Sequence, residues 1–262
     1  MDYIKQLTRF GIQQALSCIF PVAVFCTLAF SKFIHIPFVS RYDFILFICI
    51  FVQWLMLHFE LESIDELKVI FMFHILGLIL EIFKVYMGSW MYPEEALFKV
   101  CGVPLYSGFM YASVASYICQ AWKRFDLRFI DWPSNFVTYP IACLIYINFF
   151  THHFFLDLRW IIILVLFILF WKSKIHFRVN RHKYSMQAIV SFLLIGFFIW
   201  LAENIATYLG AWKYPEQLET WQIVHIGKIS SWFLLVIISI IIVANLKHLK
   251  YGQTSLAGKS HC

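Results

Sequence analysis

Long apolar stretches separated by short polar connections make up almost the whole chain. Eight stretches can be distinguished, at residues 10–30, 42–60, 67–87, 101–121, 135–152, 157–171, 187–209 and 221–245. Most approach the roughly 20 residues that an α-helix needs to cross a bilayer. We therefore predict an all-α bundle of about eight transmembrane helices. Polar residues leave little room for a loop between the fifth and sixth stretches, and the sixth is short, so seven spans are an alternative.

Composition supports a membrane location. Apolar residues make up 61% of the 262 positions and charged residues 14%, with a mean hydropathy of +0.75. A soluble domain of this length needs a more polar surface. Because every polar connection is short, we treat residues 1–262 as a single integral membrane domain. The seven cysteines are scattered without a Cys-x-x-Cys motif, so we interpret them as small apolar residues. The first apolar stretch lacks a cleavage motif, which predicts a retained helix.

The distribution of Lys and Arg predicts the orientation, because cytoplasmic connections are enriched in these residues. With eight spans, both termini and the even-numbered connections lie on one side. That side holds fourteen of the 21 Lys and Arg: Lys5, Arg9, Lys68, Lys123, Arg124, Arg128, Lys172, Lys174, Arg178, Arg181, Lys183, Lys247, Lys250 and Lys259. We therefore predict a bacterial cytoplasmic (inner) membrane protein with both termini in the cytoplasm. The net charge of +6 is thus attributed to topology, and we predict no nucleic-acid partner.

A fourteen-residue signature occurs twice at an offset of 122 residues. Its members are Glu81, Tyr86, Gly88, Trp90, Tyr92, Pro93 and Glu94 in the first copy and Glu203, Tyr208, Gly210, Trp212, Tyr214, Pro215 and Glu216 in the second. Agreement that includes Trp and Pro at a fixed offset indicates an internal duplication. The offset covers four predicted helices, an even number. We therefore expect two parallel four-helix repeats, at about 1–125 and 126–250, followed by a polar tail at 251–262.

Polar residues recur along one face of the third predicted helix. His74, Gly77, Glu81, Lys84 and Gly88 are spaced three or four residues apart, as on a single helical stripe. The seventh predicted helix repeats the pattern with Gly196, Glu203, Asn204, Thr207 and Gly210. The eighth contributes Gln222, His225, Lys228 and Ser231, and the fourth contributes Tyr106, Ser113 and Gln120. Such faces avoid lipid, so we expect a polar central cavity.

Glu81 and Glu203 are the candidate catalytic residues. A carboxyl group buried in the membrane is a functional candidate by default, and one kept neutral near pH 7 can protonate an alkene or relay a proton. The candidate substrate-binding residues are His74, Lys84, Trp90, Tyr92, Asn204, Trp212, Tyr214, His225 and Lys228. The structural alternative is that Glu81 pairs with Lys84, that Glu203 pairs with Lys228 or His225, and that the Gly-x-Trp-x-Tyr-Pro segments only end helices at the headgroup level.

We predict neither a metal site nor a cofactor. The acidic residues at 60–66 lack the spacing of a known Mg²⁺ motif, so we interpret them as a solvated loop.

The paired Glu…Gly-x-Trp-x-Tyr-Pro elements and the overall layout resemble the bacterial multi-pass membrane family known as domain of unknown function 817, a resemblance that implies a membrane location and little else. A shorter element, Gly88-Ser89-Trp90-Met91-Tyr92 followed by Gly102-Val103-Pro104-Leu105, is similar to one in membrane lycopene cyclases and carotenoid hydratases. Those enzymes protonate the ends of isoprenoid chains without a redox cofactor. They place acidic residues after Pro-Leu, where this chain has Tyr106 and Ser107.

Two functional hypotheses follow, besides a membrane scaffold. The first is an isomerase or lyase that acts on an isoprenoid-like lipid in a cavity of the bundle, with the bilayer and one hydrophobic ligand as its partners. The second is a proton-coupled transporter for a small solute. A long apolar tunnel that ends on Glu81 and Glu203 would favour the first, and a short wet vestibule on both sides would favour the second.

Overall fold

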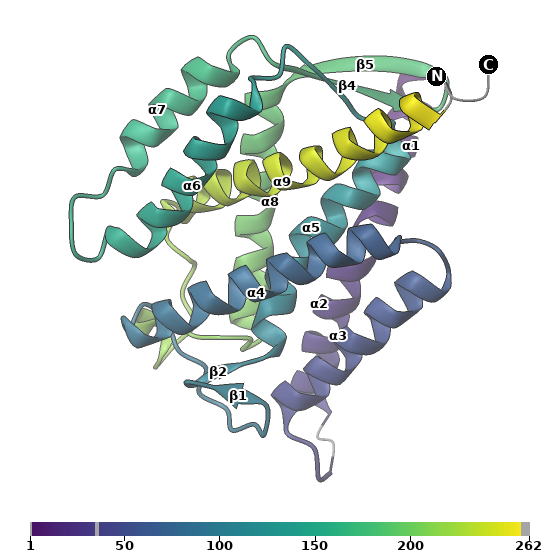
Figure 1. Ribbon diagram of the computed structural model, residues 1–262. Coiled ribbons are helices and arrows are strands. Elements are labelled where there is room, and N and C mark those ends of the chain that lie inside the picture. Colours follow the sequence, from purple (N-terminus) through teal and green to yellow (C-terminus); the bar gives the residue numbers. More distant parts are fainter. Residues whose placement is uncertain (1, 35–36, 258–262) are drawn as a thin grey trace.

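The computed structural model describes residues 2–34 and 37–257 (Figure 1). The regular structure in the described part of the chain consists of nine α-helices, five short strands and a 3₁₀ helix, η1 (Pro215–Gln217). The helices are α1 (Asp2–Ser17), α2 (Ile19–Phe33), α3 (Arg41–His58), α4 (Ile64–Tyr86), α5 (Tyr106–Phe125), α6 (Asn135–Thr151), α7 (Arg159–Phe170), α8 (Ala188–Tyr208) and α9 (Lys228–Ala257). The strands are β1 (Lys99–Val100), β2 (Val103–Pro104), β3 (Arg128–Ile130), β4 (Lys174–Val179) and β5 (His182–Gln187). Each predicted apolar stretch therefore corresponds to helical structure.

In the described part of the chain, four helices are long and apolar enough to cross a membrane. They are α3, α4, α8 and α9, and the bent pair α1–α2 would add a fifth span. At 17 and 12 residues, α6 and α7 are shorter than a full crossing. The described structure therefore supports a membrane protein with four or five long spans, and the prediction of eight spans is not confirmed.

The first predicted span, 10–30, is wrong as a single helix. The chain bends by 69° between α1 and α2. Proline lacks the N–H that bonds to the carbonyl four residues earlier, and its ring clashes with that carbonyl. For Pro21 the affected carbonyl belongs to Ser17, where α1 ends. The break thus has a local cause in the sequence.

The eighth predicted span, 221–245, starts seven residues too early. Residues 221–227 are not helical, and α9 begins at Lys228. Gln222 and His225 therefore do not share a helical face with Lys228 and Ser231. At the other end, residues 251–257 of the predicted polar tail continue α9, and 258–262 lie outside the described residues.

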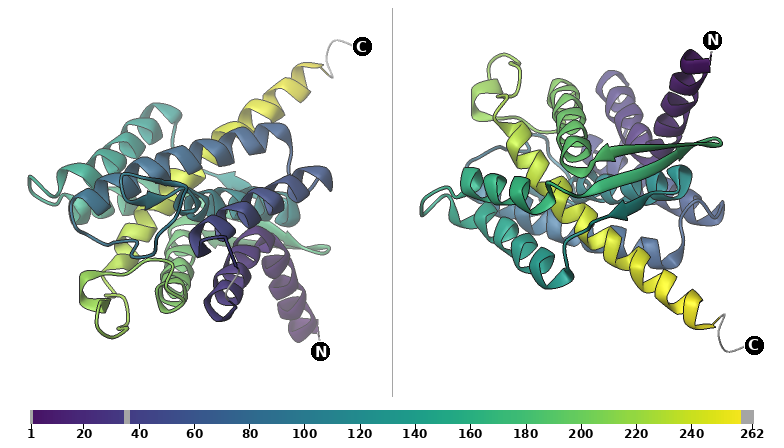
Figure 2. Two further views of the ribbon diagram at one scale, coloured as in Figure 1. Left: turned by 90° about the horizontal axis from the view of Figure 1, so that it is seen from below. Right: turned by 90° about the horizontal axis from the view of Figure 1, so that it is seen from above.

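The basic connection at 172–183 forms a hairpin. Strands β4 and β5 pair in register from Lys174↔Gln187 to Val179↔His182, and β3 joins the other edge of β4 (Figure 2). Lys174, His176 and Arg178 point outward. Val179 packs with Phe125 of α5 on the inner face of the sheet. We call this end of the molecule the sheet end.

Two close helix contacts organise the centre. A Cβ on Gly77 of α4 would lie 2.4 Å from Cγ of Tyr111 on α5, so only glycine lets this ring lie against α4. A Cβ on Gly196 of α8 would lie 3.0 Å from the backbone nitrogen of Phe233 on α9. The helix pairs α4–α5 and α8–α9 therefore approach closely, and α5 is buried in the middle of the bundle.

Candidate functional site

The repeated glycines end α4 and α8 in the same way. Gly88 has φ of +69° and Gly210 has φ of +78°, a conformation that glycine adopts without strain. In each copy the residue after the glycine donates its N–H five residues back: Ser89 to Lys84 O and Ala211 to Ala206 O, both at 2.9 Å. These bonds form the Schellman type of helix end. The glycine of the signature therefore has a structural role.

The two signature segments lie against each other. The backbone N–H of Met91 donates to Lys213 O, and the N–H of Lys213 donates to Met91 O, both at 2.9 Å. The two residues occupy equivalent positions, 122 residues apart. Trp90 of the first copy also contacts the ring of Tyr214 of the second, with 5.9 Å between centroids. The segments thus form one structural unit, which we call the signature end.

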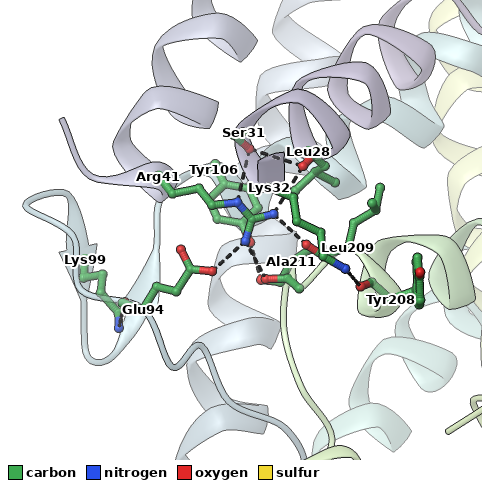
Figure 3. A network of polar contacts seen from close by, with 11 residues as sticks. Leu28, Ser31, Lys32, Arg41, Glu94, Lys99, Tyr106, Tyr208, Leu209 and Ala211 are labelled. Carbon is green, nitrogen blue, oxygen red and sulfur yellow. Dashed lines mark hydrogen bonds and ion pairs between the residues drawn. The ribbon is translucent and has the colours of Figure 1, made fainter. Parts of the chain in front are cut away.

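Arg41 at the start of α3 fastens this unit (Figure 3). Its guanidinium forms an ion pair with Glu94 of the first signature at 2.6 Å. It also donates to the carbonyl oxygens of Leu209 at 2.6 Å and Gly210 at 3.2 Å, the two residues that follow the end of α8. Tyr106 of α5 adds a hydrogen bond to Ala211 O. Several elements therefore hold the two segments in place.

Glu81 is buried and accepts three hydrogen bonds. Its Oε2 accepts from Trp90 Nε1 at 2.6 Å and from the hydroxyl of Tyr92 at 2.7 Å. Its Oε1 accepts from the hydroxyl of Tyr111 at 2.7 Å. The expected alternative of an ion pair with Lys84 is wrong, because neutral donors supply these bonds.

Glu203 is held in a corresponding way. The hydroxyl of Tyr214 donates to Oε1 at 2.6 Å, and Trp232 Nε1 of α9 donates to Oε2 at 2.7 Å. Glu81–Tyr92 and Glu203–Tyr214 are equivalent bonds in the two copies. Among the described residues, Glu203 makes no ion pair with Lys228 or His225.

A large apolar cavity of about 660 Å³ leads from the sheet end to the two carboxyl groups. At the sheet end it is lined by Phe10, Phe125 and Phe177. At the signature end, Glu81 and Glu203 lie in its wall. The other lining residues at that end are the aromatic side chains of Trp90, Tyr111, Trp212, Tyr214 and Trp232.

A second cavity of about 130 Å³ adjoins the first. Both are lined by Trp90, Tyr111, Glu203, Tyr214 and Trp232. The wall of the smaller cavity also contains Lys84, Arg159, Lys228 and His152. We call it the basic pocket. The site therefore has an apolar part and a cationic part that meet at Glu203.

Lys84 of α4 is held by two histidines. Lys84 Nζ lies 3.3 Å from His152 Nε2 and 2.7 Å from His153 Nε2. His152 Nδ1 lies 2.8 Å from Asn148 O, an acceptor, so Nδ1 carries the proton and the neutral Nε2 accepts from Lys84. Burial and the neighbouring ammonium lower the pKa of His153 to about 4. Both histidines are thus neutral acceptors at pH 7.

The structure brings part of the predicted set together. Glu81, Lys84, Trp90, Glu203, Trp212, Tyr214 and Lys228 line one or both cavities. Tyr92 lies behind this wall and contacts Glu81.

Three predicted binding residues lie elsewhere. His74 is packed between Phe71 and Phe109. Asn204 binds the Val224 N–H and the carbonyl of Trp200. His225 is exposed in the connection before α9. None of the three lines either cavity, and their assignment as binding residues stays a prediction.

Four residues of the site were not predicted. Tyr111 and Trp232 donate to the two carboxyl groups, and His152 and Arg159 complete the basic pocket. Gly77 gives one usable signal, since a small residue one turn from Glu81 allows a facing ring to approach it. We find no comparable signal for Trp232, which has no counterpart in the first copy.

The acidic connection is only partly a solvated loop. Glu62 is 2% exposed and accepts hydrogen bonds from Ser116 and from Gln53 Nε2. Glu66 is 1% exposed and forms ion pairs with Lys123 and Lys247, both at 2.5 Å. Within the described residues, no group of three or more His, Cys, Asp or Glu is placed to hold a metal ion. These carboxylates therefore fasten α3, α4, α5 and α9 to one another.

Comparison with known proteins places the chain in a family. The sequence model described as "Protein of unknown function (DUF817)" matches residues 6–240. The chain is similar to the uncharacterized protein YoaT of Bacillus subtilis, with 56% identity over 250 residues that make up 95% of each chain. Its fold resembles that of MvINS, a mycobacterial Insig homolog from Mycobacterium vanbaalenii, with a TM-score of 0.50 and 11% identity. That likeness covers 69% of this chain and 93% of the other and concerns the fold alone.

Proposed function

We propose that this chain, which belongs to the DUF817 family, binds a membrane lipid with one long apolar chain and acts on its polar end by acid–base chemistry. The observation that carries the proposal is the shape of the large cavity. It runs from Phe10 and Phe177 at one end to Glu81 and Glu203 at the other. Its volume of about 660 Å³ lies within the roughly 300–1,000 Å³ typical of small-molecule sites.

The lining of the cavity favours a lipid over a polar solute. Along most of its length the wall is made of Phe, Leu, Ile, Val and Ala side chains, and the carboxyl groups lie at one end. An apolar chain can leave the bilayer for such a wall without losing hydrogen-bond partners, whereas a polar group placed there without a partner has a cost in free energy. A path for a small polar solute needs polar groups along its length, and this wall supplies only scattered ones, at Gln14, Ser113, Tyr117 and Ser191. The geometry therefore supports the lipid hypothesis over the transporter.

The cavity also offers a lateral entrance. Leu194 and Phe198 of α8 line it, yet they are 44% and 63% exposed on the outside of the molecule. Pro21 and Phe25 of α2 line the cavity as well, and so does Cys18 between α1 and α2. We infer that a lipid enters from the bilayer between α2 and α8, without crossing water.

The two carboxyl groups have different surroundings, and we assign them different roles. Glu203 borders both cavities, where it meets the polar end of a bound chain. We assign its protonated form the transfer of a proton to a double bond of the ligand, which leaves a carbocation and the Glu203 carboxylate. The carboxylate then removes a proton from a carbon next to the cationic centre, which forms the new double bond and restores the acid. The indole and phenol rings of Trp90 and Tyr214 are placed to stabilise that cation. Glu81, which accepts three hydrogen bonds, orients Trp90, Tyr92 and Tyr111.

The binding step is tested by filling the cavity. Ala202 of α8 lines it, whereas its neighbour Leu201 does not and is 37% exposed. We expect wild-type protein purified from membranes to retain about one apolar lipid per chain by native mass spectrometry. Ala202→Trp should lose this lipid, and the matched control Leu201→Trp should keep it. Equal lipid content in all three proteins would contradict the proposal.

The chemical step is tested by a comparison of lipid profiles. Cells that overproduce the wild type should accumulate an isomerised or hydrated lipid, and Glu203→Gln should abolish it while the protein still retains the substrate. Glu81→Gln should weaken both retention and turnover, since three donors lose their charged acceptor. A profile unchanged by wild-type overproduction would reject the catalytic role and leave the binding role to be judged by the previous test.

A further inference from the structure

The basic pocket has features that the binding of an apolar chain does not explain. Three cationic side chains, Lys84, Arg159 and Lys228, surround about 130 Å³ of space. Ser89 and Ser231 add hydroxyl groups to the same wall. An apolar chain would gain nothing from these groups, and enclosing them away from water has a cost unless they are paired.

Two of the three cations have no carboxylate partner among the described residues. Arg159 pairs with Asp157 at 3.2 Å, but neither Lys84 nor Lys228 takes part in an ion pair within that part of the chain. The carboxyl group that shares the pocket, Glu203, accepts hydrogen bonds from Tyr214 and Trp232 and carries at most one negative charge. The positive groups of the pocket therefore outnumber the negative ones.

A simple role at the membrane surface does not account for Lys84. Lysines near helix ends usually extend their ammonium groups to the headgroup region. Lys84 is only 6% exposed, and its ammonium is directed to the imidazoles of His152 and His153. These neutral rings accept hydrogen bonds but leave the positive charge uncompensated. The pocket thus lacks one component, an anion.

The position of Lys228 links the pocket to the large cavity. Its Nζ lies 5.0 Å from the ring centroid of Trp90 and 4.7 Å from that of Tyr214. The same two rings end the apolar cavity. An anionic group in the basic pocket is therefore next to the end of a chain that fills the large cavity.

We propose that the basic pocket binds a phosphate group and that this phosphate is the headgroup of the lipid whose chain occupies the large cavity. This inference rests on the proposed function and names the class of its ligand, a single-chain lipid phosphate. Lys84 and Lys228 neutralise the phosphate, and Arg159 and the two serines supply further hydrogen-bond donors. Glu203 then lies at the junction of headgroup and chain.

The test compares three probes on the full-length protein in detergent: geranylgeranyl monophosphate, geranylgeraniol and inorganic phosphate. We expect the lipid phosphate to bind at least tenfold more tightly than the alcohol, and inorganic phosphate to bind more than a hundredfold more weakly than the lipid phosphate. Lys84→Met and Lys228→Met should each reduce the preference for the lipid phosphate to below threefold without changing affinity for the alcohol. The control Lys68→Met removes an exposed cation paired with Asp65 and should change neither affinity.

The outcomes separate this inference from the proposed function. Equal affinity for the lipid phosphate and the alcohol, in a protein that binds both, overturns the phosphate assignment and leaves lipid binding intact. Failure to bind either lipid contradicts the proposed function as well. If inorganic phosphate binds as tightly as the lipid phosphate, the pocket is an anion site for free phosphate, and the assignment to a lipid headgroup is overturned. The comparison of probes on the wild type decides among these even if a lysine variant does not fold.

Discussion

At the scale of single residues, carboxyl groups are buried away from water and accept hydrogen bonds from neighbouring side chains. Glu81 accepts a hydrogen bond from the hydroxyl of Tyr111 only because Gly77 leaves room for that ring. Glu62 accepts hydrogen bonds from Ser116 and Gln53. Removal of one donor leaves a buried acceptor partly unsatisfied, which typically costs about 1–3 kcal/mol. Stability and site geometry are thus coupled at these positions.

Gly77→Ala tests the coupling at Glu81. The new methyl group would lie 2.4 Å from Cγ of Tyr111, so the ring must move and the bond to Glu81 is lost. Overpacking of this kind typically costs about 1–3 kcal/mol. We expect a lower melting temperature and weaker binding of the ligand. Gly11→Ala is the matched control for the melting temperature alone, because a Cβ there meets nothing within 4 Å although the residue lines the large cavity. Equal melting temperatures for the two variants would refute this account of the contact.

Glu62→Gln tests a pH effect outside the membrane spans. Burial raises the pKa of this carboxyl, and the bonds from Ser116 and Gln53 oppose the shift. Because the folded-state pKa lies above the unfolded one, stability falls as the pH rises through the interval between them. An amide can satisfy both partners without a charge. We expect Glu62→Gln to stabilise the protein at pH 8 and to have little effect below about pH 4, as measured by melting curves. Destabilisation at pH 8 would contradict this.

Residue spacing predicted part of the site. The stripe at 74–88 identified Glu81 and Lys84, and the duplication identified Glu203, Trp90 and Tyr214. Hydrogen-bond partners such as Tyr111 and Trp232 come from other helices, and helical periodicity carries no information about which helices are neighbours. His225 was misplaced because Gln222 to Ser231 fits a helical stripe, although the helix begins only at Lys228.

At the scale of elements, the signature explains how helices end. Gly88 and Gly210 close α4 and α8 with the same hydrogen bonds, and the chain then returns to place a tyrosine hydroxyl beside the carboxyl group of its own helix. Trp90 also donates to Glu81, whereas the indole that donates to Glu203 belongs to Trp232 of α9 and not to Trp212. The repeated signature therefore encodes a helix end and one tyrosine donor together. Equivalent residues Met91 and Lys213 pair across the two copies, a contact that a local two-fold axis would produce. The internal duplication and the two parallel four-helix repeats stay a prediction.

Gly210→Ala tests the helix end. A φ of +78° disfavours an L-residue by roughly 1–2 kcal/mol. We expect a matching loss of unfolding free energy and a displaced Tyr214, which would weaken ligand binding. Gly210→Asn should lose less, because Asn tolerates left-handed conformations better than Ala. If Gly210→Ala and Gly210→Asn have the same small effect, the positive φ at this position is not what requires glycine.

Element boundaries were the weaker part of the sequence prediction. Apolar length located α3, α4 and α8 to within a few residues. It merged α1 and α2 because hydropathy averages over Pro21, and it read β4 and β5 as a loop because only every second side chain of that hairpin is apolar. These errors concern local backbone geometry, about which hydropathy carries no information.

At the scale of the whole molecule, two ends of different chemistry face each other along the large cavity. The sheet end is basic on its outer face, and the signature end carries the carboxyl groups and the basic pocket. The positive-inside rule places the sheet end and both termini in the cytoplasm. That orientation is our proposal, and it would open the basic pocket toward the outer leaflet.

Cysteine labelling in intact cells tests the orientation. Cys101 is exposed in the turn between β1 and β2, near the signature end. In a chain that keeps only this cysteine, we expect labelling by a membrane-impermeant maleimide before lysis. A chain whose single cysteine is Arg181→Cys, at the tip of the β4–β5 hairpin, should be labelled only after lysis. The reverse labelling pattern would show that the orientation in the membrane is opposite to the one we propose.

The most direct test of the central claim, a lipid chain lying along the large cavity, is photocrosslinking with geranylgeranyl phosphate that carries a diazirine at the far end of its chain. We predict that crosslinked peptides contain residues 10–15 of α1 or 175–177 of β4, at the sheet end of the cavity, and that excess unlabelled lipid abolishes them. Crosslinks confined to outward-facing positions such as Phe51 and Ile147, unaffected by the competitor, would contradict the account.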